Sequence, residues 1–175
     1  MLDAIISSKL RVKLLHKFLI NPELSSYLRG LESELQVSSN AVRQELNKLE
    51  EAGLVQAKAE GNKKIFRANK DHPLFEDLRR ILMKSVGIEQ IIEKVISRIG
   101  DLEQVYLTGA LARGIDSSVI DLIFVGRVDQ EYLFTLAGKA EKIINKKIRY
   151  ALYQPEEWSA SKLPPTDTLL LYENG

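Results

Sequence analysis

The stretch from Val37 to Val55, VSSNAVRQELNKLEEAGLV, constrains the fold more than any other part of the sequence. At about 100° per residue it forms a helix with two different sides: Val42, Leu46 and Leu49 lie on one, and Asn40, Arg43, Gln44 and Asn47 lie on the other. Arg, Asn and Gln are the side chains that match base edges in the major groove of DNA. Ser38 or Ser39 could cap the helix start, and Gly53 favours its end. The pattern indicates a recognition helix, although an ordinary solvated helix carries a similar stripe.

Two amphipathic segments precede this helix. Residues Ser7 to Ile20 carry leucines and a phenylalanine at helical spacing, with lysines elsewhere on the cylinder, and Asn21 and Pro22 end the segment. A second helix is predicted from Leu24 to Leu35, immediately before the recognition helix. Two short helices joined by a tight turn are typical of a helix-turn-helix.

After Gly53 the spacing of apolar residues changes from helical to strand-like. The run LVQAKAEGNKKIFRANK predicts two strands joined by a turn at Glu60, Gly61 and Asn62, with cations that could reach phosphates or a minor groove. A solvated hairpin is the alternative, but its place after the helices favours a DNA-binding wing. The candidate DNA-binding residues are Ser39, Asn40, Arg43, Gln44, Asn47, Lys48, Lys58, Asn62, Lys63 and Lys64.

Composition limits the other classes of function. Up to Lys70 there are 12 Lys or Arg against 8 Asp or Glu, whereas the remainder has 13 against 16, so the basic excess accompanies the recognition helix. The chain has no Cys and two distant His, so neither a metal site nor a cofactor is expected. No apolar run approaches the roughly 20 residues of a membrane span, and a cytoplasmic protein without a membrane partner is expected.

Residues Ser7 to Lys70 resemble a winged helix-turn-helix of the ArsR-like kind found in prokaryotic transcriptional regulators, and NAVRQELNKLEEAGL carries the resemblance. The resemblance implies a domain over residues 1–70 that binds double-stranded DNA as a homodimer.

Two further helices are expected over residues 71–100. Asp71 could cap the first and Pro73 fits its first turn. Its predicted apolar side comprises Leu74, Phe75, Leu78, Ile81 and Leu82, and Gly87 separates it from a helix over Ile88 to Ile99 that Gly100 ends. Such helices can pack on a core, connect domains or form a dimer seam, and these choices stay open.

Residues 101–175 contain strand-like and helical segments in alternation. The strands are predicted at VYLTG, IDLIFVG, KIRYALY and TLLLY, and a helix is predicted from Asp129 to Asn145. This alternation predicts an α/β domain with a small mixed sheet. The fold class as a whole is α+β in two domains, with a winged helix over 1–70, a helical connector over 71–100 and an α/β domain over 101–175.

The segment YLTGALARGIDSSVIDLIFVG resembles the opening motif of the DNA polymerase β-like nucleotidyltransferases in their minimal form. In that family a Gly-Ser pair and turn hold a nucleoside triphosphate, and three carboxylates bind paired Mg²⁺. Gly109, Arg113, Gly114, Ser118 and Asp121 match the motif, whereas Ala110 replaces the serine and Val119 the first carboxylate. The strand expected to carry the third has Arg149 and Tyr150. The resemblance implies a vestigial nucleotide site comprising Gly109, Ala110, Arg113, Gly114, Ser118 and Asp121, with Asp121 accepting hydrogen bonds from the Gly109–Gly114 turn.

These observations favour a sequence-specific DNA-binding transcriptional regulator that is not an enzyme, with residues 101–175 serving regulation or oligomerisation. The alternatives are an active nucleotidyltransferase targeted by the winged helix, and an interaction module that binds a nucleotide or another phosphate-bearing ligand. The active nucleotidyltransferase requires that one carboxylate, Asp121, suffices for catalysis, whereas the interaction module does not.

Overall fold

The computed structural model describes residues 2–94, 99, 101–159, 163 and 167–174. The chain has a mixed α+β architecture with two small sheets and divides into two compact units, Met1–Leu82 (unit 1) and Met83–Gly175 (unit 2). The helix α5, Phe75–Val86, crosses this division. The boundaries expected near residues 70 and 100 stay predictions.

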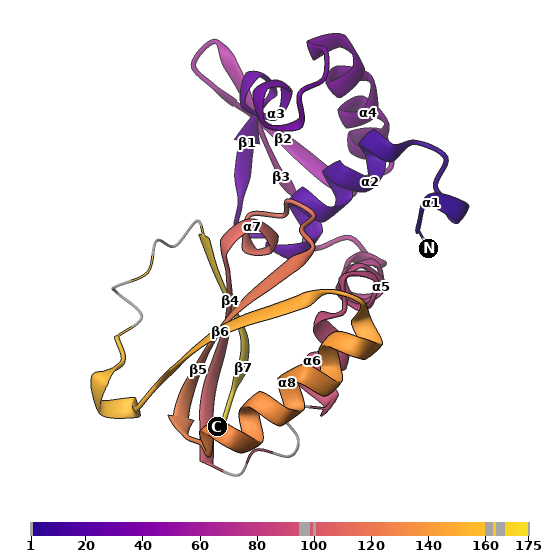
Figure 1. The fold of residues 1–175 in the computed structure, drawn as a ribbon. Helices are drawn as coiled ribbons and strands as arrows, with labels where there is room; N and C mark the ends of the chain where they lie inside the picture. Colours follow the sequence, from indigo (N-terminus) through magenta and orange to yellow (C-terminus); the bar gives the residue numbers. More distant parts are fainter. Residues whose placement is uncertain (1, 95–98, 100, 160–162, 164–166, 175) are drawn as a thin grey trace. The chain divides into compact units, whose positions relative to one another are not determined.

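Unit 1 combines short helices with a three-stranded antiparallel sheet (Figure 1). In chain order its elements are α1 (Leu2–Ile5), α2 (Lys9–Leu15), a π-helical turn (His16–Ile20), β1 (Ser25–Tyr27), α3 (Leu28–Leu35), α4 (Ser39–Glu51), β2 (Val55–Glu60) and β3 (Lys63–Ala68). The strand order is β1-β3-β2.

The helix expected at the centre of the sequence is α4. Ser38 is its N-cap and accepts a hydrogen bond from the amide of Ala41, which satisfies one free donor of the first turn. The three apolar residues of the predicted stripe, Val42, Leu46 and Leu49, are buried, and the polar residues opposite are exposed. Gly53 has a φ of 73°, which favours glycine there. The predicted two-sided helix is confirmed.

The helix expected from Leu24 to Leu35 is wrong in its first part. Ser25–Tyr27 form β1, which pairs antiparallel with β3 from Ser25 opposite Arg67 to Tyr27 opposite Ile65, and α3 starts only at Leu28. Because the strand depends on a partner about 40 residues away, helical spacing within the segment carried no sign of it.

Lys17 is buried, although a lysine of an amphipathic helix is expected to be exposed. Only 6% of this residue is accessible, and its Nζ lies 2.8 Å from Oε2 of Glu34. The π-helical turn at His16–Ile20 changes the angular spacing of side chains, and all five of its residues are buried. The ion pair therefore links this turn to α3.

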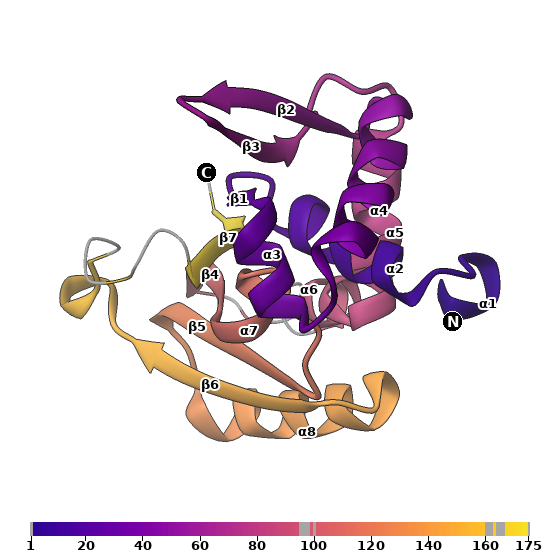
Figure 2. The same cartoon turned by 90° about the horizontal axis from the view of Figure 1, so that it is seen from above.

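The hairpin prediction is confirmed: β2 and β3 pair from Val55–Ala68 to Glu60–Lys63, and Gly61 and Asn62 form the turn (Figure 2). The Tyr27 hydroxyl of β1 donates a hydrogen bond to the carboxylate of Glu60 beside the turn. This hydrogen bond, together with partial burial and the negative charge of Glu60, raises the pKa of Tyr27. The hairpin is thus held by β1 along one edge and is not a free arm.

Unit 2 contains a four-stranded mixed sheet of order β6-β5-β4-β7. Its elements are α6 (Ile88–Lys94), β4 (Asp101–Thr108), α7 (Gly109–Ala112), β5 (Val119–Arg127), α8 (Gln130–Ile144), β6 (Lys147–Tyr153), a 3-10 turn (Pro155–Glu157) and β7 (Thr168–Glu173). Among the described strand pairs of this sheet only β5–β6 is parallel, because α8 crosses over between them.

The helix α8 lies along one face of the unit 2 sheet (Figures 1 and 2). Asp129 caps it by accepting from the amide of Tyr132, and Asn145 ends it with a φ of 53°. Its buried side consists of Leu133, Leu136, Ala137 and Ala140, whereas Ile144, at the same helical spacing, is only partly buried. At Gly87 an added Cβ would lie 2.8 Å from Cβ of Ile144, so only glycine allows this approach between the α5–α6 junction and the end of α8.

The helices over residues 71–94 differ in part from their prediction. Phe75 and Leu82 are buried, but Leu74 and Ile81 are 55% and 45% exposed, so the apolar side of α5 is narrower than expected. His72, not Asp71, accepts the amide hydrogen bond of Leu74, at 3.1 Å. The second helix is described as α6 up to Lys94, and Ile99, its predicted last residue, is buried but not helical. Residues 95–98 and Gly100 lie outside the described residues.

Two apolar stripes that could have formed a dimer seam, at residues 7–20 and 88–94, are buried inside their own units. Leu14, Phe18 and Leu19 are buried in unit 1, and Ile88 and Ile91 are buried in unit 2. Since burial removes them from a second copy, these stripes give the expected homodimer no support. Across the described part of the chain, no helix has the length and apolar character that crossing a bilayer requires.

Candidate functional site

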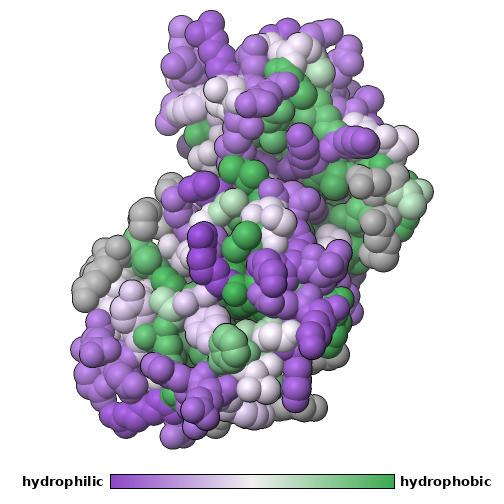
Figure 3. Space-filling view, in the orientation of Figure 1, coloured by the Kyte–Doolittle hydropathy of each residue, from purple (hydrophilic) through white to green (hydrophobic). Residues whose placement is uncertain are grey.

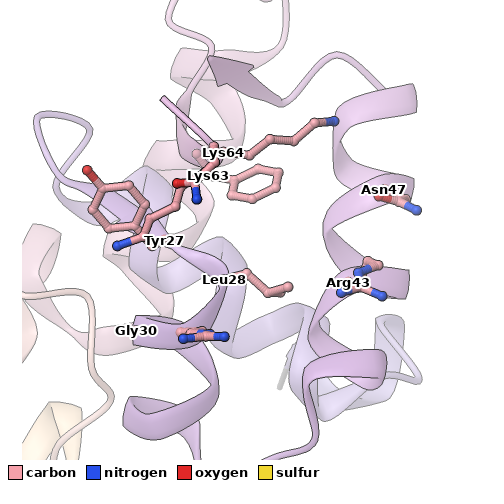
Figure 4. A pocket seen from close by; sticks show the side chains of 10 residues that line it. Tyr27, Leu28, Gly30, Arg43, Asn47, Lys63 and Lys64 are labelled. Carbon is pink, nitrogen blue, oxygen red and sulfur yellow. The ribbon is translucent and has the colours of Figure 1, made fainter. Parts of the chain in front are cut away.

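A cavity of about 650 Å³ opens between α3, α4 and the β2–β3 hairpin of unit 1 (Figure 4). We call it the cationic hollow. Its lining residues are Tyr27, Leu28, Arg29, Gly30, Arg43, Asn47, Asn62, Lys63, Lys64 and Phe66. The side chain of Leu28 points from the start of α3 into the space that faces Arg43 on α4 (Figure 4). The hollow thus combines a charged rim with an apolar floor of Leu28 and the buried Phe66.

The rim collects cations from three elements: Arg29 on α3, Arg43 on α4, and Lys63 and Lys64 on β3. None of the described residues that line the hollow is acidic. The Nζ of Lys63 lies 5.7 Å from the centre of the Tyr27 ring, a distance suited to a cation–π contact. Hydrophilic residues dominate the visible surface over the hairpin tip (Figure 3). The rim therefore offers positive charge to an anionic ligand.

Five of the ten residues predicted to bind DNA line the hollow, namely Arg43, Asn47, Asn62, Lys63 and Lys64. The others, Ser39, Asn40, Gln44, Lys48 and Lys58, lie elsewhere on α4 and β2. Ser39 donates a hydrogen bond to Glu32, and Lys48 lies 3.4 Å from Glu45, so both are engaged within unit 1.

Sequence reasoning missed the other half of the lining: Tyr27, Leu28, Arg29, Gly30 and Phe66. These residues come from β1, the first turn of α3 and β3. Arg29 was detectable as a cation just before the recognition helix, but the inward position of Leu28 depends on where α3 begins.

In unit 2, strand register brings three side chains on one face of the sheet into one row. Thr108 of β4 lies opposite Asp121 of β5, and Asp121 lies opposite Arg149 of β6. We call these residues the polar row. The Nε of Arg149 donates a hydrogen bond to Oδ1 of Asp121, and this hydrogen bond together with the negative charge of Asp121 raises the pKa of Arg149. The next row is apolar and includes Tyr106, Ile123 and Ala151.

The other oxygen of Asp121 lies against the glycine turn. A Cβ added to Gly109 would stand 2.6 Å from Oδ2 of Asp121, and Gly109 has a φ of 69°. Asp121 is paired with Arg149 through Oδ1, and the expectation that it also accepts from the amides of this turn stays a prediction. The register of β5 against β6 sets this pairing, and the sequence motif alone does not contain it.

The remaining residues of the predicted nucleotide site have structural contacts. Arg113 forms an ion pair with Asp167 at 3.1 Å, and Gly114 has a φ of 73° after the short helix α7. The carbonyl of Ala110 accepts from the amides of Arg113 and Ile115. The carbonyl of Ser118 accepts from the amide of Lys147, which aligns the starts of β5 and β6.

The residues of the polar row do not fit a pair of divalent cations. Paired Mg²⁺ requires several hard oxygen ligands, but Asp121 is paired with a guanidinium and its neighbour two positions away is Val119. Among the described residues there is no group of three His, Cys, Asp or Glu that could hold a metal ion.

No protein-family model and no curated protein matches the chain. Among solved structures, the chain is similar to a mutant of the MntA–HpeT toxin–antitoxin, at 21% identity and a TM-score of 0.39 over 49% of this chain and 72% of that one. It is also similar to the complex of a tri-AMPylated Shewanella oneidensis HEPN toxin with the MNT antitoxin, at 20% identity and a TM-score of 0.38 over 53% and 74%. A candidate nucleotidyltransferase from Sulfolobus solfataricus matches at 26% identity and a TM-score of 0.34 over 52% and 79%.

One of these neighbours is described as a candidate nucleotidyltransferase. We withdraw our expectation that the chain is not an enzyme. That expectation rested on counting metal-binding carboxylates.

Proposed function

We propose that unit 1 binds duplex DNA, with α4 as the helix that enters the major groove and the β2–β3 hairpin as a wing beside it. The observation that carries this proposal is the convergence of four cations from three elements on one hollow, with no acid among its described lining residues. The exposed side of α4 adds Asn40, Arg43, Gln44 and Asn47, whose donors and acceptors suit base edges. In this proposal unit 1 has the winged-helix arrangement and acts as the DNA-reading part of a transcriptional regulator.

Binding is tested by mobility shift with the whole chain, first on a random duplex pool and then on the selected sequence at two salt concentrations. We expect affinity to fall as salt rises, because released counterions drive contacts to phosphate. The variant Arg43→Ala with Lys64→Ala removes two rim cations and should weaken binding. Arg80→Ala is the matched control, because Arg80 is an exposed cation of α5 that belongs neither to the hairpin nor to the lining of the hollow. Equal affinity of the double variant and the wild type would contradict the proposal.

A second candidate function concerns unit 2, where we propose that the polar row and the Gly109–Gly114 turn bind a nucleotide. The observation that favours it is the exposed guanidinium of Arg149. Its Nε donates to Asp121, and its other N–H groups can donate to a phosphate bound beside the turn. Incubation with labelled nucleoside triphosphates and either Mg²⁺ or Mn²⁺ tests both binding and transfer. Binding that is lost in Arg149→Ala supports this function, and equal retention of nucleotide by that variant opposes it.

A further inference from the structure

The floor of the cationic hollow is not explained by contacts to duplex DNA. Phosphates on the outside of a duplex can reach the exposed rim cations, but they gain nothing from apolar side chains below them. Leu28 is half-buried and points into the hollow, and Phe66 is 6% exposed (Figure 4). A ligand that uses both parts must carry an anionic group and an apolar, ring-sized body.

The dimensions of the hollow suit such a ligand. Its volume of about 650 Å³ falls within the range of roughly 300 to 1,000 Å³ for small-molecule sites, which are mostly apolar with a few placed polar groups. Asn47 on α4 and Asn62 in the hairpin turn also line the hollow and add amide donors and acceptors.

We infer that the cationic hollow binds one unstacked nucleotide, with its phosphate at Arg43 and Lys64 and its base against Leu28 and Phe66. The same rim cations serve the proposed DNA contact, so a free mononucleotide in the hollow competes with duplex DNA. The competition rests on the proposed function, whereas nucleotide binding does not. A nucleotide unpaired within a DNA strand has the same chemistry, and it is the second source of this ligand.

Calorimetric titration of the whole chain with AMP, ribose 5-phosphate and adenosine separates the contributions of ring and phosphate. We expect AMP to bind more tightly than either fragment. Leu28→Ala should weaken AMP binding by about three- to tenfold, because a half-buried leucine loses part of its apolar contact, while the affinity for fully paired duplex stays unchanged. Arg80→Ala should leave both affinities unchanged.

Two further arms identify the source of the nucleotide. Displacement of labelled duplex by AMP supports a free mononucleotide, and tighter binding of a duplex with one unpaired nucleotide, lost in Leu28→Ala, supports a nucleotide within the strand. The inference is overturned if AMP binds no better than ribose 5-phosphate and Leu28→Ala changes neither the affinity for AMP nor that for the duplex with one unpaired nucleotide. This holds even when fully paired duplex still binds. If duplex binding fails while Leu28-dependent AMP binding remains, only the proposed DNA function is overturned.

Discussion

Asp121 and Arg149 lie directly opposite each other on the parallel strands β5 and β6 and form an ion pair on one face of the sheet. The Asp121 side chain is 18% exposed and that of Arg149 is 75% exposed, so water replaces most of what the pair provides to stability. We expect Arg149→Ala to leave the unfolding temperature almost unchanged. Scanning calorimetry checks this, and a large fall would show that the pair has a structural role that its exposure does not indicate.

Gly109→Ala should destabilise unit 2 by about 1 to 3 kcal/mol, because alanine is strained at a positive φ and its Cβ would meet the Asp121 carboxylate. Chemical denaturation measures the change. Gly138→Ala is the control, because Gly138 lies within α8 with open space around its Cα and alanine favours a helix. Equal stability of the two variants would contradict the close packing of Gly109 on Asp121.

Glu34→Gln should cost more stability than Lys17→Met. The Lys17 side chain is 8% exposed and would keep its charge without an anionic partner, whereas the Glu34 side chain is 27% exposed and water can solvate it when Lys17 is removed. We expect a loss of about 1 to 3 kcal/mol for Glu34→Gln and a small change for Lys17→Met. Urea unfolding of both variants measures the order, and the reverse order would show that the buried ammonium is solvated in another way.

Glu45 should make unit 1 less stable in acid. Burial favours its protonated form, but hydrogen bonds and charge from Arg11, the Ser8 hydroxyl and Lys48 outweigh burial and lower the pKa of Glu45 below its ordinary value of 4.5. The stabilisation is therefore present above about pH 4.5 and is lost as pH falls through the lowered pKa.

In Glu45→Gln this part of the pH dependence should disappear. Unfolding at a series of pH values between neutral and strongly acidic tests it, with Glu51→Gln as an exposed control from the end of the same helix. If the free energy of unfolding falls with pH in the same way in Glu45→Gln and in the wild type, Glu45 is not the source of the acid sensitivity.

Arg43→Ala should weaken binding of the selected DNA by about 1 to 3 kcal/mol and relax its preference at one position, if Arg43 reads a base. Lys63→Ala should weaken all sequences alike and reduce the salt dependence, because a lysine at the hairpin contacts phosphate. Binding to the selected site and to single-base variants distinguishes the two. Uniform weakening by Arg43→Ala would assign Arg43 to phosphate as well.

Local pattern was enough to predict α4, the hairpin and α8, because their burial follows from residues within one segment. It was not enough for β1, which exists through pairing with β3, or for the burial of Lys17 in a π-helical turn. The sequence pointed to Arg43, Asn47, Asn62, Lys63 and Lys64 by residue type alone. Tyr27, Leu28 and Phe66 join them only because three elements meet, and Arg149 meets Asp121 only through the parallel register of β5 and β6.

The pairing of β4 with β7 has a consequence for the order in which the chain folds during synthesis. Thr108 and Thr168 are register partners across 60 residues, so β4 lacks one neighbour until that stretch has left the ribosome. The three strands of unit 1, by contrast, all precede residue 69. Unit 1 can therefore complete its sheet while the edge of β4 is still open to wrong pairing.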